Sequence, residues 1–164
     1  MEISYDSLVK WFNAYFEDFN RNNPGPLASV LNMKRYFTDD MEFWAFNQAG
    51  PRPSPRGALL TTMVHPGLLE QLTPLEYTVD LKKMIVVVKF QIVFKDLPSG
   101  KAWPPKQASA HYHLVLDKKG EPKIKKILYF MEQRPPEEGG YRELWLKYRE
   151  KEFAEHKELV SQLN

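Results

Sequence analysis

Hydrophobic residues near the start of the chain recur at steps of three and four positions. Over residues 4–23 this stripe contains Leu8, Val9, Phe12, Tyr15, Phe16 and Phe19. The spacing puts their side chains on one face of a helix, with polar residues on the other face. Ser4 suits the N-cap, because its hydroxyl can accept a hydrogen bond from the first turn. Pro24 and Pro26 end the helix, since proline cannot continue one.

The segment between this helix and residue 76 contains short elements and turns. Residues 27–37 predict a second helix, and residues 41–46 predict a strand. Residues 47–57 form a loop with three prolines and two glycines, and loops of this length often border functional sites. Residues 58–72 predict a third helix, kinked at His65-Pro66-Gly67, because proline and glycine interrupt helical geometry.

The period of the pattern changes to two from Glu76 onward. The alternation predicts four strands, at 77–82, 85–95, 107–116 and 123–132. Residues 96–100 and 117–120 have turn chemistry, and connections this short favour antiparallel neighbours. Helices followed by such strands predict an α+β domain whose helices cover one face of a sheet.

The C-terminal residues 140–164 predict an amphipathic helix that extends a domain formed by residues 1–139. Its expected buried face consists of Tyr141, Leu144, Trp145, Tyr148 and Leu159. Prolines and glycines at 135–140 precede this helix, so we consider it as a lid that can detach from the domain.

Composition narrows the classes of function. The 164 residues suit one domain, and a chain with 43% hydrophobic and 13% aromatic residues is not expected to be disordered. The chain has no cysteine, which excludes a disulfide scaffold, thiolate catalysis and cysteine-ligated metal. A balance of 23 basic and 21 acidic residues is too even for electrostatic binding of nucleic acid. No segment resembles a signal peptide or a membrane helix, so we expect a cytoplasmic protein without a membrane partner.

The order of the predicted elements resembles a known superfamily. YFTDDMEF at the first strand, SPRG before the third helix and LVLDKKGEPKIKKILYF across the last hairpin resemble nuclear transport factor 2-like proteins over about residues 5–133. This group includes ketosteroid isomerases, SnoaL-like polyketide cyclases and scytalone dehydratase. The resemblance implies a cystatin-like cone, in which a curved antiparallel sheet wraps round the long N-terminal helix and leaves a pocket at the open mouth. It also implies a homodimer that pairs through the sheet.

Two tyrosines stand where this resemblance implies hydrogen-bond donors. Tyr15 lies in the first helix, where the isomerases place a catalytic tyrosine, and Tyr112 matches the position at which they keep a protonated aspartate. A neutral phenol can donate a hydrogen bond to a developing oxyanion. The alternative for both residues is packing, since each shares its face with apolar residues.

The general base is missing from the place that the resemblance implies. The isomerases end the first strand with an aspartate, and the matching position here is near Ala45, which cannot take a proton. We therefore do not expect steroid isomerisation of the known kind.

His111 and His113 are candidate proton shuttles, as in the dehydratases of the superfamily, since imidazole titrates near neutrality. Strand alternation puts both on the face opposite Tyr112, and we expect Tyr112 to face the pocket because its face is more apolar.

His111 and His113, with Asp117 nearby, also have the outline of a metal site. A glycine that flanks this motif in cupin-type proteins is absent, and no further histidine follows on a strand. We expect no metal and no cofactor.

Bulky side chains on the predicted strands and at the helix kink suggest how the pocket is lined. The expected lining residues are Trp44, Phe46, His65, Phe90 and Phe130. Such a lining favours a small apolar cyclic molecule, unless the rings fill the hollow themselves. We expect a lyase, isomerase or cyclase that uses tyrosine and histidine acid–base chemistry. The alternative is a non-catalytic module of the same fold that binds a ligand or a partner protein.

Overall fold

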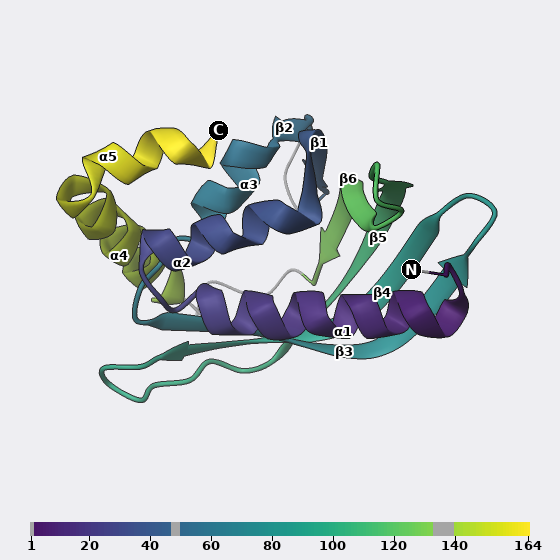
Figure 1. Ribbon diagram of the computed structural model, residues 1–164. Coiled ribbons are helices and arrows are strands. Elements are labelled where there is room, and N and C mark those ends of the chain that lie inside the picture. Colours follow the sequence, from purple (N-terminus) through teal and green to yellow (C-terminus); the bar gives the residue numbers. More distant parts are fainter. Residues whose placement is uncertain (1, 47–49, 133–139) are drawn as a thin grey trace.

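A long N-terminal helix, α1 (Tyr5–Asn22), lies along the inner side of a curved sheet (Figure 1). The computed structural model describes residues 2–46, 50–132 and 140–164. Ser4 caps α1 as predicted, because its hydroxyl accepts a hydrogen bond from the Ser7 amide at 3.2 Å. The predicted apolar stripe is confirmed, since the buried face of α1 includes Leu8, Phe12, Tyr15, Phe16 and Phe19.

The segment after α1 is shorter in its helices and longer in its strand than predicted. Helix α2 (Leu27–Leu31) passes into a 3₁₀ helix, η1 (Asn32–Tyr36), and strand β1 (Phe37–Ala45) begins directly afterwards. A two-residue strand, β2 (Ser54–Pro55), pairs with β1 and leads into helix α3 (Arg56–Thr62).

The predicted third helix over residues 58–72 is wrong beyond Thr62. His65, Pro66, Gly67 and Leu68 form a tight turn, in which the Leu68 amide donates to the His65 carbonyl at 3.0 Å. Gly67 has a φ of +96°, which glycine tolerates, and proline before it suits a type II turn. The turn ends the helical region and starts strand β3 (Leu68–Asp80) nine residues before the predicted strand at 77.

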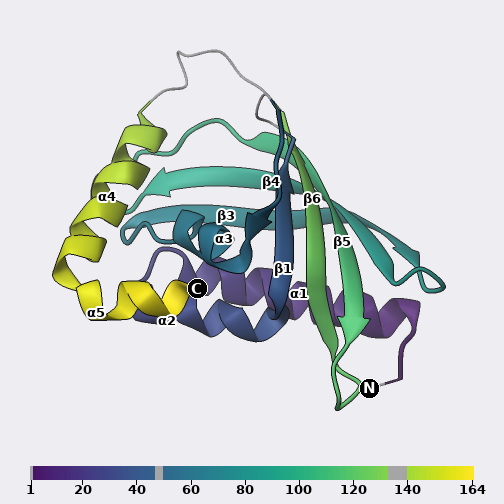
Figure 2. The same cartoon turned by 90° about the horizontal axis from the view of Figure 1, so that it is seen from above.

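In the described part of the chain, six strands form one sheet, whose order is β2-β1-β6-β5-β4-β3. The last three strands in the chain match the predicted ones closely and are β4 (Ile85–Asp96), β5 (Lys106–Leu116) and β6 (Pro122–Met131). Figure 2 shows β1, β6 and β5 running steeply across β4 and β3, so that the sheet curves over α1. This is the cone that the sequence predicts, with one correction. The sheet is mixed, because β1 lies parallel to β6, and the long stretch of chain between these two strands permits that pairing.

The C-terminal segment forms helix α4 (Tyr141–Glu155), a short helix α5 (Lys157–Val160) and a 3₁₀ turn, η3 (Ser161–Leu163). It is tied to the domain, because the Glu152 carboxylate accepts a hydrogen bond from the Leu27 amide at 2.7 Å and so caps the start of α2. None of the helices in the described part of the chain is both long and apolar enough to span a membrane.

Candidate functional site

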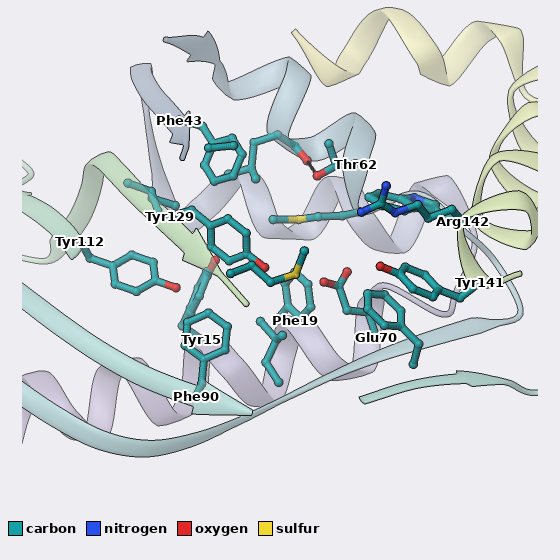
Figure 3. Close-up of a pocket in the computed structure, with 18 of the residues that line it drawn as sticks. Tyr15, Phe19, Phe43, Thr62, Glu70, Phe90, Tyr112, Tyr129, Tyr141 and Arg142 are labelled. Carbon is teal, nitrogen blue, oxygen red and sulfur yellow. Dashed lines mark hydrogen bonds between the residues drawn. The ribbon is translucent and has the colours of Figure 1, made fainter. Parts of the chain in front are cut away.

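A cavity of about 450 Å³ lies between the inner face of the sheet and helices α1, α3 and α4 (Figure 3). Its aromatic lining consists of Tyr15, Phe19, Phe43, Phe90, Phe94, Tyr112, Tyr129, Tyr141 and Trp145. Thr62, Glu70 and Arg142 are further polar side chains in the wall. The size is in the range of pockets that enclose a small organic ligand, so the rings do not fill the hollow.

Tyr15, Tyr112 and Phe90 line this cavity, where the sequence placed them. Tyr15 and Tyr112 are each only 3% exposed, and Figure 3 shows both phenols pointing into the space between the sheet and α1. Within the described residues neither hydroxyl has a hydrogen-bond partner. Burial first and the Glu70 carboxylate second raise the pKa of Tyr15, and burial raises the pKa of Tyr112 well above its ordinary value. Both phenols therefore stay protonated and can donate.

Strand alternation on β5 separates Tyr112 from the two histidines. Ala110, Tyr112 and Leu114 are buried on the inner face, whereas His111 and His113 are half-buried on the outer face. Burial, followed by the charges of Lys126 and His111, lowers the pKa of His113. His111 and His113 do not line the cavity, and the role of proton shuttle that the sequence analysis gave them has no support from their position.

A third tyrosine, Tyr129 on β6, joins the two predicted ones. It shares the inner face with Ile127 and Met131, and Figure 3 shows its hydroxyl close to the same central space. Burial, with Glu70 second, raises the pKa of Tyr129. Sequence reasoning chose its neighbour Phe130 instead. The alternation that includes Ile127 was the signal that could have identified Tyr129.

Glu70 is the carboxylate that the sequence analysis missed. It lies on β3 between Leu68 and Leu72, both buried, and its side chain is 17% exposed in the cavity wall. The sequence analysis assigned residues 58–72 to a helix. That assignment hid the fact that a strand would put Glu70 on the same face as these two leucines.

Two asparagines, Asn20 in α1 and Asn23 at its C-cap, hold the β3 backbone around Glu70. The Asn23 amide donates to the Glu70 carbonyl at 2.9 Å and accepts from the Glu70 amide at 2.9 Å. Asn20 makes the same pair of bonds with Leu72, at 2.9 and 2.7 Å. Because β3 is the edge of the sheet, these side chains satisfy backbone groups that no further strand pairs. The position of Glu70 is therefore fixed from α1.

His65 lies behind Glu70, and it does not line the cavity as predicted. The tight turn before β3 buries it completely, with 0% exposure. Its Nδ1 is 2.7 Å from the Leu68 carbonyl oxygen, and its Nε2 is 3.5 Å from Oε2 of Glu70. The Trp145 ring meets the imidazole edge-on, with 5.6 Å between ring centres.

Three predicted lining residues lie outside the cavity. Trp44, Phe46 and Phe130 occupy the outer face of the sheet, where Phe46 stacks on Phe130 with ring centres 4.8 Å apart. The sequence analysis chose them for their size. Their neighbours along β1 and β6, Phe43 and Tyr129, are the residues that face inward, because successive strand residues alternate between faces.

The C-terminal helix completes the wall. Tyr141 stacks on Phe94 at 4.2 Å between ring centres, and its hydroxyl accepts a hydrogen bond from the buried Lys106 ammonium at 3.1 Å. Arg142, Trp145 and other residues of α4 line the same side of the cavity. The sequence analysis considered a detachable lid, and the described part of this segment packs as one side of the site.

The fold, but not the sequence, links the chain to known proteins. No protein-family model matches the sequence, and no curated protein matches it either. Among solved structures, AclR from Streptomyces galilaeus, named as a proposed hydroxylase, has 12% identity and a TM-score of 0.58 over 80% of this chain and 93% of its own. A proposed polyketide cyclase from Xanthomonas campestris has 16% identity and a TM-score of 0.53 over 86% and 95%.

An NTF-2 like protein of unknown function from Silicibacter pomeroyi has 10% identity and a TM-score of 0.54, over 79% of this chain and all of its own. Identities this low show a shared fold. The chain therefore has the nuclear transport factor 2-like fold that the sequence resemblance implied, with a pocket in its hollow.

Proposed function

We propose that the protein is an acid–base enzyme that moves a proton on an apolar cyclic carbonyl compound, as isomerases, lyases and cyclases do. One observation supports this most directly: Glu70 lies in the wall of an aromatic cavity into which three tyrosine hydroxyls point (Figure 3), and none of the three has a hydrogen-bond partner among the described residues. Enolisation needs a base near the carbon and donors near the oxygen, and this arrangement provides both.

Glu70 takes the role of base that the sequence analysis gave to a histidine. Its carboxylate accepts a proton from the carbon next to the carbonyl, and the electron pair of that bond moves to the carbonyl oxygen. Tyr15, Tyr112 and Tyr129 donate to the resulting oxyanion. Their raised pKa values keep these donors protonated at any physiological pH. The Xanthomonas protein of the same fold is named as a proposed polyketide cyclase, and polyketides carry carbonyl groups, which is consistent with a carbonyl substrate.

Exchange of the α-protons of 2-tetralone in heavy water, followed by NMR, tests the proposal. We expect the protein to accelerate exchange and Glu70→Gln to lower the rate by roughly 10²–10⁴-fold, the usual contribution of a general base. Glu76→Gln is the matched control, because Glu76 is an exposed carboxylate on the same strand. Exchange that Glu70→Gln leaves unchanged contradicts the proposal. Binding of 2-tetralone without any acceleration supports the non-catalytic alternative.

A further inference from the structure

The His65 ring has one nitrogen committed and one facing Glu70. Its Nδ1 lies 2.7 Å from the Leu68 carbonyl, which can only accept, so Nδ1 carries a proton. In a neutral imidazole this leaves Nε2 bare. Within the described residues Nε2 is buried without a hydrogen-bond partner, and it lies 3.5 Å from Oε2 of Glu70.

A bare ring nitrogen beside a bare carboxylate is unfavourable at this depth. Both present lone pairs to each other, and a buried polar atom without a partner costs about 1–3 kcal/mol. One proton between the two atoms removes both problems. From the elements packed against the ring, β3 contributes Glu70 and α4 contributes the Trp145 indole, which does not ionise. Among the described residues, Glu70 is thus the ionisable group that faces the ring.

We propose that His65 is a positioning residue that carries a proton on Nε2 and holds Glu70 ionised against the cavity wall. This inference rests on the proposed function, in which Glu70 is the base. The protonated Nε2 faces Oε2, as an ion pair at 3.5 Å, and leaves Oε1 to meet the substrate. The imidazolium charge offsets the cost of a carboxylate in an aromatic cavity, where a lone carboxyl group takes up a proton and loses its basicity.

Nitrogen-15 NMR of the histidine rings tests the proton without a substrate. The spectrum of His65→Asn identifies the His65 signals among the four histidines of the chain. We expect both ring nitrogens of His65 to be protonated at neutral pH. In Glu70→Gln the side-chain amide donates to Nε2, so Nε2 becomes bare. A bare Nε2 in the native protein overturns the proposal. That outcome includes the case in which Nε1 of Trp145, which has no hydrogen-bond partner among the described residues, donates to Nε2.

Two substitutions separate the structural bond from the charge. In His65→Asn the amide nitrogen falls near the place of Nδ1 and keeps the bond to Leu68, while nothing faces Glu70. In His65→Gln the amide nitrogen falls near the place of Nε2 and donates to Glu70 without a charge. We expect the acid limb of the pH profile for 2-tetralone exchange to move to higher pH in both, and further in His65→Asn. A move of one pH unit lowers the rate about tenfold at a fixed pH on that limb.

The outcomes of the two experiments are distinguishable. An unchanged pH profile in both variants, with a stability loss alone, shows that His65 is structural and overturns the proposal. If the native protein does not accelerate exchange but both ring nitrogens are protonated, the proposed function fails and the ion pair stands.

Discussion

Individual hydroxyl groups in this protein have two different fates. The Tyr36 hydroxyl donates to the buried Asp18 carboxylate, to which Arg35 also donates. Burial raises the pKa of Asp18, but these donors outweigh it and hold that pKa below its ordinary value. The Tyr112 hydroxyl, by contrast, has no partner among the described residues and points into the cavity. The first hydroxyl serves stability, and the second is available to a ligand.

This difference predicts that a change from tyrosine to phenylalanine lowers stability at position 36 and the rate of exchange at position 112. Tyr36→Phe removes one of the donors to Asp18 and leaves those of Arg35 and Arg21. It is expected to lower the free energy of unfolding by about 1.5–3 kcal/mol, the usual range for a hydrogen bond to a charged group. Tyr112→Phe is expected to change it by less than about 1 kcal/mol and to slow 2-tetralone exchange by up to about a hundredfold. Urea unfolding and the exchange assay on both variants check this. A large stability loss in Tyr112→Phe with normal exchange contradicts the proposed role.

At single positions, the sequence identified cavity residues where the buried face of the helix or strand was read from its pattern. Tyr15 follows from a helical stripe and Tyr112 from an alternating strand, and both line the cavity. Glu70 was missed because residues 58–72 were read as helix, in which the alternation that exposes it to the cavity cannot be seen. Phe130 was preferred to Tyr129 on size alone. Size does not decide which face of a strand a residue occupies, whereas the parity of its buried neighbours does.

Among the elements, helix α4 is held to the sheet at a second point besides the hydrogen bond between Lys106 and Tyr141. The Tyr148 hydroxyl donates to Asp96 at 2.7 Å, where β4 ends. Hydrogen bonds from Ser99 and Tyr148 hold the pKa of Asp96 below its ordinary value of 3.8. A carboxylate with a lowered pKa stabilises the folded state above its unfolded pKa, and this contribution is lost as the pH falls through the folded pKa.

Tyr148→Phe is therefore expected to be destabilising in a pH-dependent way. At neutral pH the variant loses one charged hydrogen bond and unfolds at a lower urea concentration than the native protein. As the pH falls below 3.8 and through the lowered pKa of folded Asp96, the native carboxylate becomes protonated, so the gap between the two proteins narrows. Urea unfolding at a series of pH values measures the gap. A gap that stays constant down to the acid limit indicates that the tie to Asp96 does not carry the effect.

The element order and the antiparallel hairpins have local causes in the sequence, whereas the pairing of β1 does not. Turns at 96–100 and 117–120 fix β4, β5 and β6 as antiparallel neighbours. No local signal in β1 specifies that it lies parallel to β6, since that choice depends on how the whole chain returns. The same holds for α4, whose docking joins residues far apart in the sequence.

For the whole molecule, the sheet separates an inner cavity from an outer aromatic patch, formed by Trp44, Phe46, His111 and Phe130. Phe46 is 41% and Phe130 is 38% exposed, and their rings stack with centres 4.8 Å apart. His111 adds a ring contact to Phe130 at 5.5 Å. Exposed rings gathered on one face are characteristic of surfaces that bind other proteins.

We expect this patch to pair two copies of the chain, because two-fold pairing lets one apolar surface cover itself. Sedimentation equilibrium of the native protein should then give about twice the chain mass of 19.3 kDa. The double variant Phe46→Glu with Phe130→Glu should sediment as a monomer, since it brings like charges together on that face. Leu81→Glu is the control, because Leu81 is 44% exposed at the turn between β3 and β4. A native protein that stays at the mass of one chain at every concentration, or a control that dissociates equally, would show that the patch does not join two copies.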